Sequence, residues 1–152
     1  MRLLVVTILS YALAFPAVAA DLDLDACIVN RDGSPELRFT LRNNDENEFT
    51  IEESELPWGI EGAIVVAYRG DAIVGKALRR AFSIRDPILN KVKIFGHDEI
   101  AGNIELRELY PELNKVAEDK GVLIFWAYTL PGAERPMKSG ALLLDSYSKC
   151  KL

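Results

Sequence analysis

The segment of this chain that most resembles a known ligand-binding motif is Gly70–Ala77, which matches a phosphate-binding loop up to its last position. Gly70, Gly75 and Lys76 stand where such a loop needs them. Ala77, however, replaces the hydroxyl residue that would hold magnesium, and Ile73 and Val74 are typical of a strand rather than a helix. We therefore interpret the segment as a hairpin in which Ala72–Val74 returns as a strand, and we predict no cofactor.

The other side chains that could take part in catalysis occur singly or next to one another in the sequence. His97 is the only histidine and stands beside Asp98 and Glu99, but a turn rarely aims adjacent side chains at one ion, so we predict a polar turn and no metal. Lys138 and Ser139 are neighbours, which makes no catalytic dyad without the right geometry. Acidic side chains at 52, 53 and 55 are typical of a solvated face. These patterns predict no catalytic site.

Two features could bind a partner. Four cations in an acidic protein form a candidate basic patch: Lys76, Arg79, Arg80 and Arg85. Such a patch fits either an acidic partner or ordinary surface charge. Trp58, in the loop-like Leu56–Gly59, fits either an interface anchor or a lid over one end of a core. Both alternatives stay open at the level of sequence.

The first 20 residues have the pattern of a secretory signal peptide. Arg2 precedes an apolar run from Leu3 to Leu13, and small residues follow up to Asp21, so cleavage is expected before Ala20 or before Asp21. The run is too short for a membrane-spanning helix, and aspartates separate it from Cys27, which disfavours a lipid anchor. We expect an exported protein, periplasmic or secreted, with no stable membrane anchor.

Removal of 20 residues would leave 132, enough for one domain at residues 21–152. The full chain has a net charge of −5, which disfavours nucleic acid as a partner. Only two cysteines are present, Cys27 and Cys150, and in an oxidising compartment they are expected to form one disulfide.

Short alternating segments dominate the rest of the chain and predict an all-β fold. Leu37, Phe39 and Leu41 alternate with polar residues, and 122–128 is the most apolar strand. Further strands are expected at 27–29, 49–51, 63–68, 92–95, 100–106 and 141–144. One short helix is expected at about 111–120, beginning at Pro111. About eight strands with wide turn spacing favour an immunoglobulin-like antiparallel β-sandwich, in which the first and last strands can lie side by side.

Several segments resemble small secreted immunoglobulin-like β-sandwich proteins, similar to the accessory domain found beside deuterolysin-like peptidases. These segments are Leu37–Asn44, Leu56–Gly59, Tyr68–Asp71, Gly96–Leu106 and Leu109–Pro111. The resemblance covers most of the chain after residue 20 and implies a fold rather than a reaction. Because no His-Glu-x-x-His motif is present, it implies no peptidase activity.

Three functions remain as hypotheses. The first is an exported, non-enzymatic binding protein that acts on another protein as an inhibitor, an immunity-type protein or an accessory domain. The second is a structural envelope component that pairs through a sheet edge. The third is an enzyme of unrecognised type, for which the sequence nominates no complete set of catalytic groups.

Overall fold

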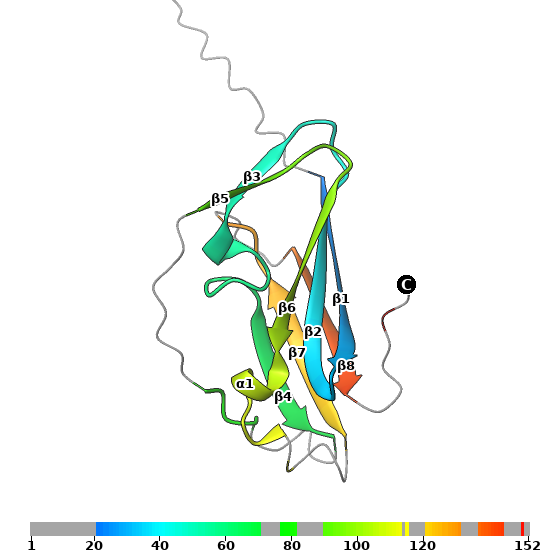
Figure 1. Cartoon of the computed structure of the whole chain (residues 1–152), viewed down its shortest axis with the longest axis vertical. Helices are drawn as coiled ribbons and strands as arrows, with labels where there is room; N and C mark the ends of the chain where they lie inside the picture. Colours follow the sequence, from blue (N-terminus) through cyan, green and yellow to red (C-terminus); the bar gives the residue numbers. More distant parts are fainter. Residues whose placement is uncertain are drawn as a thin grey trace, which may run out of the picture.

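The computed structural model describes residues 21–70, 77–81, 90–113, 115, 121–131, 137–144 and 150. In these residues two three-stranded antiparallel sheets, ordered β1-β2-β6 and β4-β7-β8, are joined by a two-stranded ribbon of β3 and β5 (Figure 1). The elements are β1 (Leu22–Arg31), β2 (Ser34–Asn43), β3 (Phe49–Glu52), a 3-10 turn (Glu53–Glu55), β4 (Ile64–Arg69), β5 (Lys91–Ile94), β6 (Glu99–Glu105), α1 (Leu106–Leu109), β7 (Val122–Tyr128) and β8 (Lys138–Leu144). The predicted all-β, sandwich-like fold is confirmed.

The β1-β2 hairpin follows directly from its residues. Asp32 and Gly33 form the two-residue turn with φ angles of 52° and 81°, a backbone shape that suits the twist of a hairpin and favours an Asp-Gly pair. β1 is longer than the predicted 27–29. It begins at Leu22 because Leu22 and Leu24 continue the pairing with the end of β2, while Asp23 and Asp25, which alternate with them, point away from the core.

The core lies between the inner faces of the two sheets. Leu37, Phe39 and Leu41 of β2 are fully buried, as their alternation predicts. Trp126 of β7 is also buried, and its ring meets that of Phe39 edge-on, with ring centroids 5.3 Å apart. Edge-to-face aromatic pairs add to the free energy gained by burying their area. This contact therefore joins the central strands of the two sheets.

Asn43 stands at the corner where β2 leaves the first sheet, and its side chain is fully buried. Its amide NH₂ donates to the carbonyl oxygens of Asn47, Ile94 and Phe95 at 2.7, 3.2 and 3.3 Å. Its side-chain oxygen accepts a hydrogen bond from the backbone N–H of Asp45 at 3.1 Å. One buried amide thus connects the turn after β2 to the end of β5, where the β3-β5 ribbon meets the sandwich.

On one side of the sandwich, ion pairs join β8 to β1, and a disulfide fixes Cys150 to β1. The predicted disulfide between Cys27 and Cys150 is present, with Cα atoms 5.2 Å apart. The Lys138 ammonium also bonds the carboxylates of Asp23 and Asp25 at 2.8 and 3.2 Å. The hydrogen bond to Lys138 lowers the pKa of Asp23, and the same bond raises the pKa of Lys138.

The helix expected at about 111–120 lies only partly within the described residues, and α1 is a further helical turn that was not expected. α1 precedes that segment, and Pro111 and Glu112 form a turn rather than the first turn of a helix. The sequence pattern did not reveal that α1 begins at Leu106. The apolar alternation of the preceding strand continues to Leu106, and this residue is buried whether it ends a strand or begins a helix. Leu113 and Lys115 are helical, and residues 116–120 lie outside the described residues.

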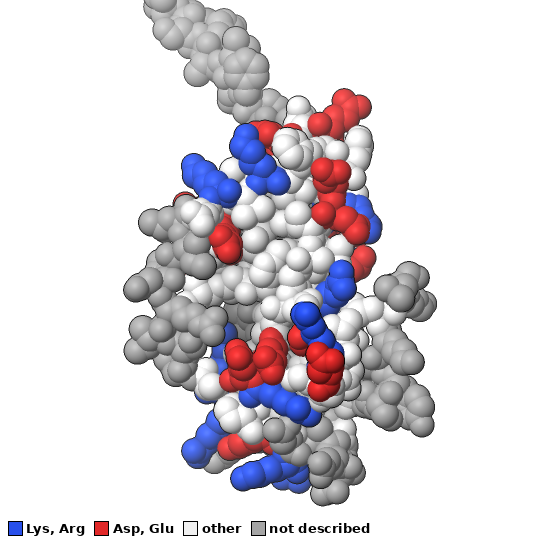
Figure 2. All heavy atoms as spheres, in the orientation of Figure 1, with Lys and Arg blue, Asp and Glu red and all other residues white. Residues whose placement is uncertain are grey.

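The outer faces of the two sheets differ in charge. The first sheet carries charged side chains of both signs on its outer face, at Asp23, Asp25, Arg31, Glu36, Arg38, Arg42, Glu99 and Glu105. Acidic and basic side chains lie interleaved over these strands (Figure 2). The outer face of the second sheet has nine outward positions and no charge, and we name it the apolar face: Ile64, Val66, Tyr68, Leu123, Phe125, Ala127, Ser139, Ala141 and Leu143.

Two expectations fall on segments that the structure does not describe. Residues 1–20, the predicted signal peptide, and Ala72–Val74, the predicted returning strand, lie outside the described residues. Within the described ranges, no helix has the length and apolar character needed to cross a membrane. The antiparallel arrangement of β4 and its sheet differs from the parallel α/β sheet that a phosphate-binding loop requires.

The disulfide generates the first prediction. A bridge with a sequence separation of 123 restrains the unfolded chain, by about 4–5 kcal/mol in the chain-entropy model. Urea denaturation should show a loss of that order on adding reductant to the wild-type protein. A Cys27→Ser/Cys150→Ser variant serves as the control, since its stability should not respond to reductant. Equal stability of oxidised and reduced wild-type protein would contradict the prediction.

Asn43 generates the second prediction. Asn43→Leu should lower the free energy of unfolding by about 1–3 kcal/mol, because it leaves the buried carbonyl oxygen of Ile94 and two part-buried ones without their donor. Asn44→Ala is the matched control, since Asn44 is exposed, and it should change stability by less than about 0.5 kcal/mol. Both values come from urea denaturation followed by circular dichroism. Similar losses in the two variants would show that the buried amide has no special role.

Candidate functional site

A groove of about 500 Å³ runs along β6, at the edge of the first sheet opposite β1, the strand that carries Cys27. Among the described strands, β6 pairs only with β2, so the groove follows an edge of the first sheet. Its walls come from the loop before β4, the 77–81 segment, β6 and α1. Its lining residues are Trp58, Gly59, Ile60, Ala63, Arg80, Ala81, Asn103, Ile104, Glu105, Glu108 and Leu109. We name it the Trp58 groove.

The loop that presents Trp58 is held by its own backbone. The N–H of Gly59 donates to the carbonyl oxygen of Leu56 at 2.7 Å, and the N–H of Ala63 donates to that of Pro57 at 2.9 Å. A Cβ atom at Gly59 would collide with the backbone of Ser54, so this tight path requires glycine there. The loop therefore offers the indole from a defined backbone position.

The Trp58 ring packs on Gly102 of β6, where a Cβ atom would overlap the ring. Gly102 pairs with Phe39 of β2 and occupies an inward position of its strand. The indole thus fills space at the open side of the sandwich that a larger residue would have taken. Trp58 remains half-buried and also lines the groove, so it is both a lid on the core and an element of the surface.

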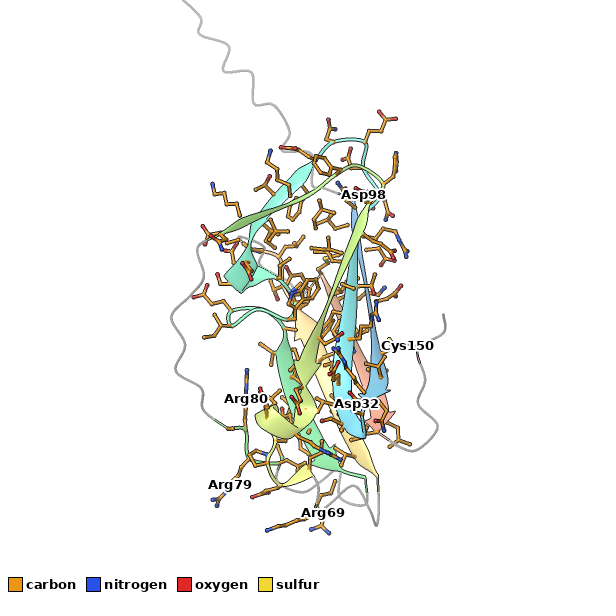
Figure 3. The ribbon with its side chains drawn as sticks, in the orientation of Figure 1. Asp32, Arg69, Arg79, Arg80, Asp98 and Cys150 are labelled. Carbon is orange, nitrogen blue, oxygen red and sulfur yellow. A yellow bond between two sulfur atoms is a disulfide. The ribbon has the colours of Figure 1, made fainter. Side chains whose placement is uncertain are left out.

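Arg80 is positioned by a short segment that is bonded at both ends. The N–H of Leu78 donates to the carbonyl oxygen of Ala67 on β4, and the N–H of Ala81 donates to that of Leu109 on α1, both at 2.8 Å. Arg79 and Arg80 lie between these anchors and extend in different directions (Figure 3). Only Arg80 lines the groove.

Tyr110 secures α1, which forms one end of the groove. It is buried, and its hydroxyl donates to the carbonyl oxygen of Val65 on β4 at 2.6 Å. Burial raises the pKa of this hydroxyl, so it remains a neutral donor at physiological pH. The bond spans the two sheets and holds Leu109, beside Tyr110, at the groove.

The groove combines an apolar floor with charges of both signs. Trp58, Ile104 and Leu109 supply apolar surface, and Arg80, Glu105 and Glu108 supply the charges. The Glu105 carboxylate accepts a hydrogen bond from the Ser34 hydroxyl at 2.9 Å, which restricts its position. Such a lining suits an extended peptide with an apolar side chain and flanking polar groups better than it suits a small polar metabolite.

The structure brings together two of the five residues predicted to bind a partner. Trp58 and Arg80 line the same groove, whereas Arg79 does not line it. Lys76 and Arg85 lie outside the described residues. Sequence reasoning missed β6 and Leu109 as parts of this site. A usable signal was Gly102, a glycine at an inward position between Ile100 and Ile104, since glycine in a strand often marks a close approach by another group.

The residues considered for catalysis lie elsewhere. His97 has a φ of 63° in an exposed turn, where its N–H donates to the carbonyl oxygen of Asp45 at 3.2 Å. Lys138 and Ser139 are consecutive in a strand and so point to opposite faces of the sheet, with Lys138 bound to aspartates of β1. The Glu55 carboxylate accepts the N–H of Glu52 at 3.3 Å and so caps the 3-10 turn.

Comparisons with known proteins add no assignment. No family model matches this chain, and no curated protein matches it. The resemblance to an accessory sandwich domain therefore stays a prediction. Across the described ranges, no group of three or more His, Cys, Asp or Glu side chains is arranged to hold a metal ion.

The packing of Trp58 generates the third prediction. Gly102→Ala should displace the indole and lower the free energy of unfolding by about 1–3 kcal/mol, because the added methyl overlaps the ring. With 5-fluorotryptophan incorporated, ¹⁹F NMR should show a shift of the Trp58 resonance, which Trp58→Phe identifies. Ala101→Ser is the control, since Ala101 is the exposed neighbour on the same strand. An unmoved Trp58 resonance in Gly102→Ala would contradict the packing.

Proposed function

We propose that this chain is an exported, non-enzymatic binding protein that takes an extended segment of another protein into the Trp58 groove. The observation behind this proposal is that Trp58 and Arg80, which are distant in sequence, line one groove along the edge of β6. An aromatic anchor beside a free strand edge provides the two elements of peptide recognition by strand addition, namely a side-chain pocket and a backbone to pair with.

The charges of the groove restrict the partner segment. Arg80 is exposed on one wall, while Glu105 and Glu108 belong to β6 and α1. A segment with an apolar side chain over Trp58, an acidic group toward Arg80 and a basic group toward the glutamates would match this arrangement. A strongly basic or strongly acidic segment would meet a like charge on one wall. The proposed partner segment is therefore mixed in charge.

Two observations support export and a non-enzymatic role. The Cys27–Cys150 disulfide fits an oxidising compartment, which agrees with the signal peptide expected at residues 1–20. Lys138 and Ser139, the serine-lysine pair considered for catalysis, point to opposite faces of their strand. The proposal covers three kinds of binding protein: an inhibitor, an immunity-type protein and an accessory domain.

Arg80 and Arg79 offer a matched test because they are adjacent and exposed, and only Arg80 lines the groove. Wild-type protein, Arg80→Glu and Arg79→Glu are immobilised and exposed to the periplasmic or culture fraction of the source cells. We expect a protein that binds the wild type and Arg79→Glu, and binds Arg80→Glu at least tenfold more weakly, since the reversed charge repels the segment's acidic group.

The bound protein is then titrated against ¹⁵N-labelled wild type by NMR. Shifts should concentrate at Asn103–Glu105 and at the Trp58 indole, because these groups line the groove. Equal binding by the two arginine variants, or shifts confined to the face opposite β6, would overturn the groove as the binding site. Turnover of the bound protein or of any added substrate by the wild type would overturn the non-enzymatic role.

A further inference from the structure

We propose that the apolar face is a self-association surface through which two copies of this chain form a weak, two-fold symmetric dimer. The face belongs to the outer side of the β4-β7-β8 sheet, whereas the Trp58 groove follows β6 of the other sheet. The inference is therefore independent of the proposed function. Its occupant is a second copy of the chain, and the arguments are charge, shape and area.

The charge pattern is the first argument. The chain places eight charged side chains on the outer face of its first sheet and none on the nine outward positions of its second. Where the outer face of an antiparallel sheet is in contact with water, the strand residues that point outward are normally polar. In a two-fold interface residue i of one copy meets residue j of the other, so a charge without an opposite partner on the same face would be buried unpaired. A face without charge avoids that cost.

Shape is the second argument. Ile64 is 65% exposed and Phe125 is 37% exposed, so both project from the face. Together with small residues including Ala127, Gly140 and Ala141, they line a shallow hollow of about 520 Å³. Gly140 is required there, because a Cβ atom would press on the Trp126 ring. One surface thus presents both projections and a recess, which is what an interface that pairs with itself requires.

The pairing of Tyr68 with Phe125 makes part of this face rigid. Their rings meet edge-on, with centroids 5.8 Å apart and planes at 84°. Rigid aromatic side chains lose little conformational entropy when they enter an interface. Tyr68 and Phe125 belong to adjacent strands, so the contact fixes them relative to the hollow.

The small area of the apolar face indicates a weak contact between the two copies. Three strands about 4.8 Å apart and seven residues long give a face of about 14 by 24 Å in plan. That is less than half of the ~800 Å² that each partner buries in a standard interface, and small interfaces are typical of weak, transient contacts. The dimer is therefore expected to be weak and reversible rather than permanent.

Ala141 and Ala101 allow a matched test. Both are exposed alanines on edge strands, Ala141 on the apolar face and Ala101 on the charged outer face of the first sheet. Sedimentation velocity is run on the oxidised protein from 5 μM to 1 mM in 0.15 M salt. We expect the wild type and Ala101→Lys to shift from monomer toward dimer, and Ala141→Lys to remain monomeric over the range.

Ile64→Lys is a second variant, because Ile64 is well exposed and its replacement leaves the core intact. It should also abolish association, and circular dichroism should confirm that every variant keeps the wild-type fold. A wild type that stays monomeric to 1 mM overturns the proposal. So does association that survives both Ala141→Lys and Ile64→Lys, or association lost in Ala101→Lys instead. Assemblies larger than a dimer would equally exclude a closed two-fold interface.

Discussion

Packing between the two inner sheet faces is the constraint on which the rest of this structure depends. Strand residues alternate between faces, so placing Phe39 and Trp126 in the core also decides which residues point outward. A slip of one residue in either register would bury charges of β2 or expose its leucines. The Trp58 groove and the apolar face are both consequences of this register, since each is built from positions that the core has already oriented.

The two open sides of the sandwich are closed by different means. Between β1 and β8 the closure is the ion pairing of Lys138 with Asp23 and Asp25, and beside it the disulfide fixes Cys150 to β1 covalently. On the β6 side the closure is the Trp58 indole on Gly102 and the hydroxyl of Tyr110 on Val65. Noncovalent contacts separate at a lower cost in free energy than a disulfide does. The side that has the groove is thus also the side better able to accommodate a partner.

Sequence patterns predicted what local alternation and composition determine. Residues 122–128 appear as a strand with the predicted bounds, and the pairing of Cys27 with Cys150 follows from there being only two cysteines. The approach of Trp58 to Gly102 joins residues far apart in the chain, and no periodicity encodes it. The difference between Arg79 and Arg80 depends on two backbone hydrogen bonds to distant residues, so it too required the fold.

The position of the disulfide has a mechanical consequence. Cys27 and Cys150 enclose nearly all of both sheets, so a pulling force applied to the chain outside the bridge passes from one cysteine to the other through covalent bonds. The β-sandwich between them bears almost none of that tension. Tension on the N-terminal side would load the first half of β1, Leu22–Ala26, which lies outside the bridge, but it would not pass through β6 or the loop that carries Trp58.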